Sequence, residues 1–138
     1  MIAYVDSSVL LRIVLAQKGR LPQWKEIEVG VVSGLVEVEC LRTLDRLRIE
    51  SALNADVIAE RREVVYRLLE SMEVVEPTTV ILRRAASPMP TSVGTLDAIH
   101  LATALMWSEV RGIRLKMLTH DRALAAASRG SGLEVLGI

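Results

Sequence analysis

The sequence predicts an α/β fold, a three-layer α/β/α sandwich with a central, mainly parallel sheet. Short apolar runs alternate along the chain with segments of helical periodicity, and strands separated by helices pair in parallel through right-handed crossovers. The length of 138 residues suits one domain, so we expect residues 1–138 to form a single unit. Hydrophobic residues make up 51% of the chain and charged residues 25%, which is the balance of a globular protein with a well-filled core.

The chain begins with a predicted strand and helix. The apolar run Ile2–Val5 predicts a buried strand that ends at Asp6. Ser7 or Ser8 would then cap a helix that continues to Val14, because the apolar side chains of this segment recur at helical spacing. The elements expected next are a strand at Glu28–Val32, a helix from Ser33-Gly34 to about Ser51, and a further helix capped by Asn54.

The second half of the chain continues the alternation. Val74-Val75, directly before Pro77, predicts a third strand. The stretch Ser87–Gly94 is rich in helix breakers and predicts a loop. Around these segments we expect a helix at Thr78–Ala86, a helix from Leu96 to about Glu109 capped by Thr95, a strand at Leu115–Leu118, a helix at Arg122–Ala127 and a last strand at Leu133–Leu136.

Composition excludes several classes of protein. Seventeen basic and seventeen acidic residues balance, which argues against a chain that coats nucleic acid by bulk charge. The single cysteine, Cys40, rules out an internal disulfide framework and fits a reducing cytoplasm. No apolar run approaches the roughly 20 residues of a membrane span, and Met1–Asp6 has no basic leader. We therefore expect a cytoplasmic protein without membrane contact.

Three of the five aspartates lie at apolar junctions near helix starts. Asp6 follows the first strand, Asp97 lies in the first turn of a helix, and Asp121 follows the strand at Leu115–Leu118. In parallel sheets the working site lies beyond the carboxyl ends of the strands, which is where Asp6 and Asp121 are expected. Helix capping is the alternative for each, since a carboxylate there gains roughly 0.5–2 kcal/mol from free amides and the helix dipole.

Convergence of the three aspartates would demand a cation. Their mutual repulsion would raise their pKa values unless a divalent ion neutralised them, and oxygen ligands select Mg²⁺ or Mn²⁺ over zinc. A fourth carboxylate is expected from the helix that follows Ser33-Gly34, where Glu37 and Glu39 point roughly 200° apart. Helical periodicity favours Glu37 as the half-buried one but leaves the choice open.

Two other groups of residues have simpler interpretations. His100 follows Asp97 by three residues and can share its helix face, and we expect a hydrogen-bonded structural histidine rather than a catalytic one. Arg42, Arg46 and Arg122 lie near the acidic segments in sequence and are candidates to steer phosphate groups, although a solvated helix face is the favoured interpretation of Arg42 and Arg46.

Four segments, in order and over nearly the whole chain, resemble motifs of the PIN-domain family. The segments are Tyr4-Val5-Asp6-Ser7-Ser8-Val9-Leu10, Ser33-Gly34-Leu35-Val36-Glu37-Val38-Glu39-Cys40-Leu41-Arg42, Leu96-Asp97-Ala98-Ile99-His100-Leu101-Ala102-Thr103-Ala104, and Leu118-Thr119-His120-Asp121-Arg122-Ala123-Leu124-Ala125-Ala126-Ala127. The third segment is the nearest match. Because one short motif carries little information and four in register carry much, the chain is identified as similar to PIN domains, and within them to VapC-type toxins.

This resemblance implies a fold, an activity and partners. It implies a PIN-like fold and a Mg²⁺- or Mn²⁺-dependent endoribonuclease toxin, paired with a cognate VapB-type antitoxin and forming homodimers. It also implies an acidic site whose metal ligands are Asp6, Asp97 and Asp121. In this pattern Glu39 rather than Glu37 completes the catalytic carboxylates, and we follow the family pattern. The residues that the resemblance assigns to supporting roles are Ser8 and Thr119.

Two other functions compete with a nuclease. A non-catalytic PIN-like module would keep the fold and only bind an antitoxin or RNA, but the acidic positions are all intact. A receiver-like phosphoacceptor also uses clustered carboxylates and a threonine, yet it needs an aspartate after a mid-chain strand, where Val74-Val75-Glu76-Pro77 offers none. Cleavage of structured RNA with Mg²⁺ or Mn²⁺, compared with cleavage in chelator, distinguishes the nuclease from the non-catalytic module.

Overall fold

The computed structural model describes residues 1–51 and 53–138. In chain order its elements are β1 (Ile2–Val5), α1 (Ser7–Val14), a short 3-10 helix (Pro22–Glu26), β2 (Val29–Ser33), α2 (Leu35–Glu50), α3 (Ala55–Glu70), β3 (Glu73–Val75), α4 (Thr79–Ala85), α5 (Thr95–Arg111), β4 (Lys116–Leu118), α6 (Arg122–Gly130) and β5 (Glu134–Leu136). This order confirms the predicted alternation of strands and helices.

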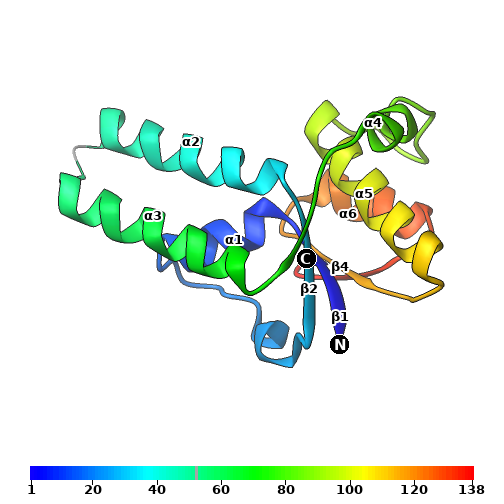
Figure 1. Cartoon of the computed structure of the whole chain (residues 1–138), viewed down its shortest axis with the longest axis horizontal. Helices are drawn as coiled ribbons and strands as arrows, with labels where there is room; N and C mark the ends of the chain where they lie inside the picture. The colour runs from blue at the N-terminus through cyan, green and yellow to red at the C-terminus, as the bar shows by residue number, and fades with distance from the viewer. Residues whose placement is uncertain (52) are drawn as a thin grey trace.

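The strands form one parallel sheet between two layers of helices. In the described residues the sheet has five strands in the order β3-β2-β1-β4-β5, with parallel pairing throughout. Figure 1 shows α1, α2 and α3 on one side of the sheet and α4, α5 and α6 on the other, with α2 and α3 side by side. The predicted three-layer α/β/α class is therefore confirmed.

Helix boundaries differ from expectation at a few caps. Asp6, rather than Ser7 or Ser8, caps α1, because its extended backbone lets the carboxylate accept from the amide of Ser8. Gly94, rather than Thr95, precedes α5 as its cap. The 3-10 helix was not expected, and α6 continues past Ala127 to Gly130. Within the described residues no helix is both long and apolar enough to cross a bilayer.

Burial of both sheet faces explains the apolar strands. Along β1, Ala3 and Val5 belong to the core under α1 and α2, whereas Tyr4 belongs to the core under α5 and α6. Successive side chains of a strand point to opposite faces, so a strand covered on both sides has to be apolar at every position. The strand register then sets Val5 beside Leu118, so the residues that follow β1 and β4 emerge together.

Packing of α2 supports the layer that carries one side of the site. Leu44 is fully buried between α2, α3 and the sheet, and we expect Leu44→Ala to lower the free energy of unfolding by about 2–5 kcal/mol, through lost burial and a residual cavity. Val38→Ala on the same helix is the control, because Val38 is 59% exposed and its truncation should change stability by less than about 0.5 kcal/mol. Urea denaturation followed by circular dichroism measures both, and equal effects would contradict the core assignment.

Candidate active site

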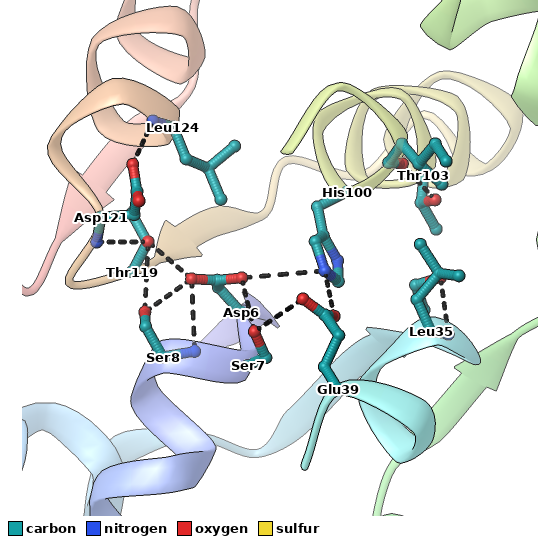
Figure 2. Close-up of polar contacts among 12 residues, drawn as sticks. Asp6, Ser7, Ser8, Leu35, Glu39, His100, Thr103, Thr119, Asp121 and Leu124 are labelled. Carbon is teal, nitrogen blue, oxygen red and sulfur yellow. Dashed lines mark hydrogen bonds and ion pairs between the residues drawn. The ribbon is translucent and has the colours of Figure 1, made fainter. Parts of the chain in front are cut away.

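Asp6 lies at the centre of the candidate site. It directly follows β1, and 4% of its side chain is exposed. Its Oδ2 accepts hydrogen bonds from the Ser8 hydroxyl at 2.6 Å, the Thr119 hydroxyl at 2.9 Å and the Ser8 amide at 3.4 Å, while Oδ1 lies 3.8 Å from Nε2 of His100. A buried carboxylate opposes folding unless such donors replace water. These contacts therefore fasten β1, α1 and the end of β4 to one another (Figure 2).

Ser8 and Thr119 extend this network toward Asp121. The Ser8 hydroxyl accepts from the backbone amide of His120 at 2.9 Å, and the Thr119 hydroxyl accepts from the backbone amide of Asp121 at 2.9 Å. Each hydroxyl thus donates to Asp6 and accepts from the chain segment after β4. The two hydroxyls therefore connect the Asp6 carboxylate to the backbone that follows β4.

Glu39 enters the site from α2 and is held at both oxygens. Oε1 lies 2.6 Å from Nε2 of His100, and Oε2 accepts from the Ser7 hydroxyl at 3.1 Å. The other ring nitrogen of His100, Nδ1, lies 2.7 Å from the hydroxyl of Tyr4. Burial alone would lower the pKa of His100, but its hydrogen bond with Glu39 and the nearby charges, including Asp6, raise the pKa overall. The expectation of a hydrogen-bonded histidine is confirmed.

The structure decides between the two glutamates of α2. Glu37 is exposed, whereas 19% of the Glu39 side chain is exposed and it faces the site, so the periodicity argument for Glu37 is wrong. The buried stripe of α2 is formed by Val36, Cys40 and Leu44. In the first turns of α2, however, the side of the stripe that carries Glu37 is open to solvent, and the side that carries Glu39 faces α5. A helical wheel of α2 alone does not reveal this difference.

Asp97 carries the uncompensated charge of the site. Within residues 1–51 and 53–138 its carboxylate receives no hydrogen bond, unlike those of Asp6, Glu39 and Asp121. Partial burial, the charges of Asp121 and Asp6 and, more weakly, that of Glu39 raise its pKa to about 6, although His100 acts in the opposite direction. Asp97 lies three residues before His100 on α5, and Nε2 of His100 lies 3.8 Å from Asp6 and 2.6 Å from Glu39, so carboxylates from separate segments of the chain come into one region.

Helix capping accounts for part of the pattern. Asp6 caps α1, and Oδ1 of Asp121 caps α6 by accepting from the amide of Leu124 at 2.9 Å. Asp97 caps nothing, because the cap of α5 is Gly94 and no side chain bonds there. Hydrogen-bonded capping is therefore seen for Asp6 and Asp121, whereas Asp97 lies in the first turn of α5 without bonding to its amides.

The four carboxylates have the right donor atoms for a hard divalent cation, but they stand too far apart to bind one together. Asp6, Asp97, Asp121 and Glu39 supply only oxygen donors, as Mg²⁺ and Mn²⁺ prefer, and their charges raise the pKa of Asp97. In the described part of the chain, however, no three His, Cys, Asp or Glu side chains already stand close enough to hold one ion. Binding of one ion by three of these carboxylates would therefore require them to come closer together.

The three arginine candidates differ in availability. Arg42 binds Asp45 on the same helix, with Nη1 2.9 Å from Oδ2, so its charge is already paired. Arg46 and Arg122 are exposed. Arg122 is the first residue of α6, next to Asp121, which leaves it the best placed of the three to meet a phosphate near the carboxylates.

Comparisons with known proteins agree on the fold. Residues 3–130 match the family model described as PIN domain, and no curated protein matches the sequence. The chain aligns with a toxin–antitoxin complex from Klebsiella pneumoniae at a TM-score of 0.68 and 15% identity, covering 97% of this chain and 95% of that one. VapBC from Rickettsia felis bound to promoter DNA aligns at a TM-score of 0.66 and 10% identity, covering 99% of this chain and 98% of that one. The sarcin–ricin loop cleaving VapC toxin of Mycobacterium tuberculosis aligns at a TM-score of 0.62 and 19% identity, covering 92% of this chain and 95% of that one.

Removal of the Thr119 hydroxyl should destabilise the network. Thr119→Val leaves a buried oxygen of Asp6 and the amide of Asp121 each without one partner, and we expect a loss of about 2 kcal/mol in the free energy of unfolding. Thr119→Ser keeps the hydroxyl and should cost less than about 1 kcal/mol. Chemical denaturation measures both variants, and a valine variant as stable as the serine variant would show that the hydroxyl does not tie the segments together.

Replacement of Asp97 should stabilise the metal-free protein. Because its pKa is raised in the folded state, ionisation of Asp97 opposes folding above that pKa, and the penalty disappears below about pH 4, where both states are protonated. We expect Asp97→Asn to raise the free energy of unfolding by about 1 kcal/mol near pH 7.5, after allowance for solvent screening. Thermal melts in EDTA at several pH values measure this. Asp56→Asn, an exposed carboxylate of α3, should bring no gain, and a destabilised Asp97→Asn protein would refute the charge-cluster interpretation.

Proposed function

Because the chain belongs to the PIN domain family, we propose that it is a metal-dependent endoribonuclease, the toxin of a VapBC-type toxin–antitoxin pair. The observation that carries the proposal is the approach of carboxylates from four separate segments. Asp6 and Glu39 lie 3.8 Å and 2.6 Å from Nε2 of His100. Asp97 precedes His100 by three residues on α5, and Asp121 is tied to Asp6 through the Thr119 hydroxyl. Such an excess of carboxylates has a chemical use when a divalent cation and an anionic substrate come together. The neighbours described as toxins, one of them cleaving the sarcin–ricin loop, support the choice of RNA.

We assign the cation to Asp6, Asp97 and Asp121. Oδ2 of Asp6 is occupied by donors from Ser8 and Thr119, whereas Oδ1 makes only longer contacts, 3.5 Å to the Ser7 hydroxyl and 3.8 Å to Nε2 of His100. Asp97 is free of hydrogen bonds in the described chain, and Asp121 uses Oδ1 as a helix cap, which leaves Oδ2. A bound Mg²⁺ or Mn²⁺ would lower the pKa of a water molecule and offset charge on the attacking and leaving oxygens of a phosphodiester.

The chain's other residues hold this arrangement in place. Ser8 and Thr119 keep the Asp6 carboxylate in one orientation, and the helix cap keeps Asp121 beside them. Glu39 stands on the α2 side of the site, where its carboxylate can accept a proton or orient water. Arg122 supplies an exposed positive charge at the start of α6 for the RNA backbone.

The proposal includes protein partners. Neighbouring folds come from structures described as toxin–antitoxin complexes, from which we infer a cognate VapB-type antitoxin for this chain. We also propose that the chain forms homodimers and acts in the cytoplasm. Co-expression with the small open reading frame next to its gene, followed by size-exclusion chromatography, tests the antitoxin and the dimer together.

Metal-dependent RNA cleavage is the decisive test. The purified, antitoxin-free protein should cleave structured RNA with Mg²⁺ or Mn²⁺ and not with EDTA. Asp97→Asn should lower cleavage by more than about 100-fold while remaining folded, because it removes a proposed ligand from a protein it does not destabilise. Asp56→Asn should cleave like the wild type. Gel analysis of labelled RNA measures each rate, and absence of metal-dependent cleavage on every RNA would favour the non-catalytic binding module instead.

A further inference from the structure

His100 is not one of the carboxylates of the site, but it lies fully buried between those carboxylates and the core. It projects from α5 toward Glu39 of α2 and the end of β1 (Figure 2). Its two ring nitrogens make separate contacts, Nε2 with Glu39 at 2.6 Å and Nδ1 with the hydroxyl of Tyr4 at 2.7 Å. It therefore joins α5, α2 and β1, which are far apart in the sequence.

The hydrogen bond between His100 and Glu39 has a defined direction. An ionised carboxylate only accepts hydrogen bonds, so Nε2 carries the hydrogen and donates it to Oε1. The Ser7 hydroxyl donates to Oε2 at 3.1 Å. A glutamate side chain has several rotatable bonds, and two donors at its two oxygens select one orientation of the carboxylate out of many.

His100 is itself held by Tyr4. Its ring packs edge-on against the ring of Tyr4, with centroids 5.9 Å apart and an interplanar angle of 67°. Tyr4 is fully buried in the middle of the sheet, and burial raises the pKa of its hydroxyl well above the usual value, so the hydroxyl keeps its proton. The place of the imidazole is thus set by the core rather than by solvent-exposed groups.

We propose that His100 is a positioning residue that transmits the rigidity of the core to Glu39, so that Glu39 orients the attacking water instead of binding the cation directly. Both oxygens of Glu39 already accept from the protein, whereas Asp97 receives no hydrogen bond within the described chain. The catalytic consequence rests on the proposed nuclease function. The bond between His100 and Glu39, and its dependence on Tyr4, stand independently of it.

The bond is tested without any activity. In protein labelled with ¹⁵N-histidine, the Nε2 proton of His100 should be visible by NMR, protected from exchange and shifted downfield, and Glu39→Gln should move it. The second histidine of the chain, His120, is the internal control, because its Nδ1 lies 2.6 Å from the carbonyl oxygen of Gly137 and should keep its resonances. An Nε2 proton of His100 that exchanges freely, or that ignores Glu39→Gln, would overturn the proposal whether or not the protein cleaves RNA.

The positioning role is tested by kinetics on RNA. His100→Leu should lower kcat about 10- to 100-fold with little change in KM, because Glu39 loses its fixed orientation while the groups that bind substrate stay in place. His100→Gln retains an amide donor and should recover much of that loss. The double variant His100→Leu/Glu39→Gln should be no slower than Glu39→Gln alone, since the histidine is proposed to act only through the glutamate.

Controls separate positioning from general stability. Tyr4→Phe removes the hydroxyl that contacts Nδ1 and should reduce kcat less than His100→Leu. Trp107→Phe removes another polar contact of a buried α5 side chain, the hydrogen bond from Nε1 to Glu73, and should leave kcat unchanged. Additive losses in the double variant, or an equal loss with Trp107→Phe, would show that His100 merely stabilises the fold. If the wild type cleaves no RNA, the proposed function fails, and the NMR result still decides the bond.

Discussion

A carboxylate buried at the end of the central strand is the constraint on which the site depends. Asp6 is 3% exposed, and its charge has to be satisfied by donors that the fold brings to it. Those donors come from the start of α1 and from the segment after β4. Asp6 can therefore be buried only when these segments come together in one arrangement. Because Asp6 also donates its amide to Leu118 at 2.9 Å, the sheet and the side-chain network fix the same junction.

The remaining carboxylates differ in how far the protein satisfies them. Asp121 receives a helix amide and Glu39 receives donors from His100 and Ser7, whereas Asp97 receives no hydrogen bond from the described residues. The resulting repulsion is stored where the proposed chemistry takes place, and a cation would relieve it. Stability given up at one residue for function is a common feature of active sites.

The core and the site are continuous through Tyr4 and His100. Tyr4 fills the middle of the sheet with its ring and places its hydroxyl against a histidine that in turn contacts Glu39. An aromatic ring with one polar atom suits this position, because the ring adds to the apolar packing and the hydroxyl reaches a buried polar partner. The Cys40 thiol, by contrast, packs in the opposite core, where burial raises its pKa to about 12 and keeps it neutral, as expected of a packing residue.

The sequence by itself determined the order of strands and helices, the parallel α/β/α class and the placement of Asp6 and Asp121 after strands, because these follow from local periodicity and from the handedness of crossovers. Motif resemblance added Glu39, Ser8 and Thr119. Only the tertiary structure decided that Glu39 and not Glu37 faces the site, that Asp97 caps no helix, and that His100 links Tyr4 to Glu39. Those outcomes depend on which neighbouring element covers each flank of a helix, and no single segment of the chain contains that information.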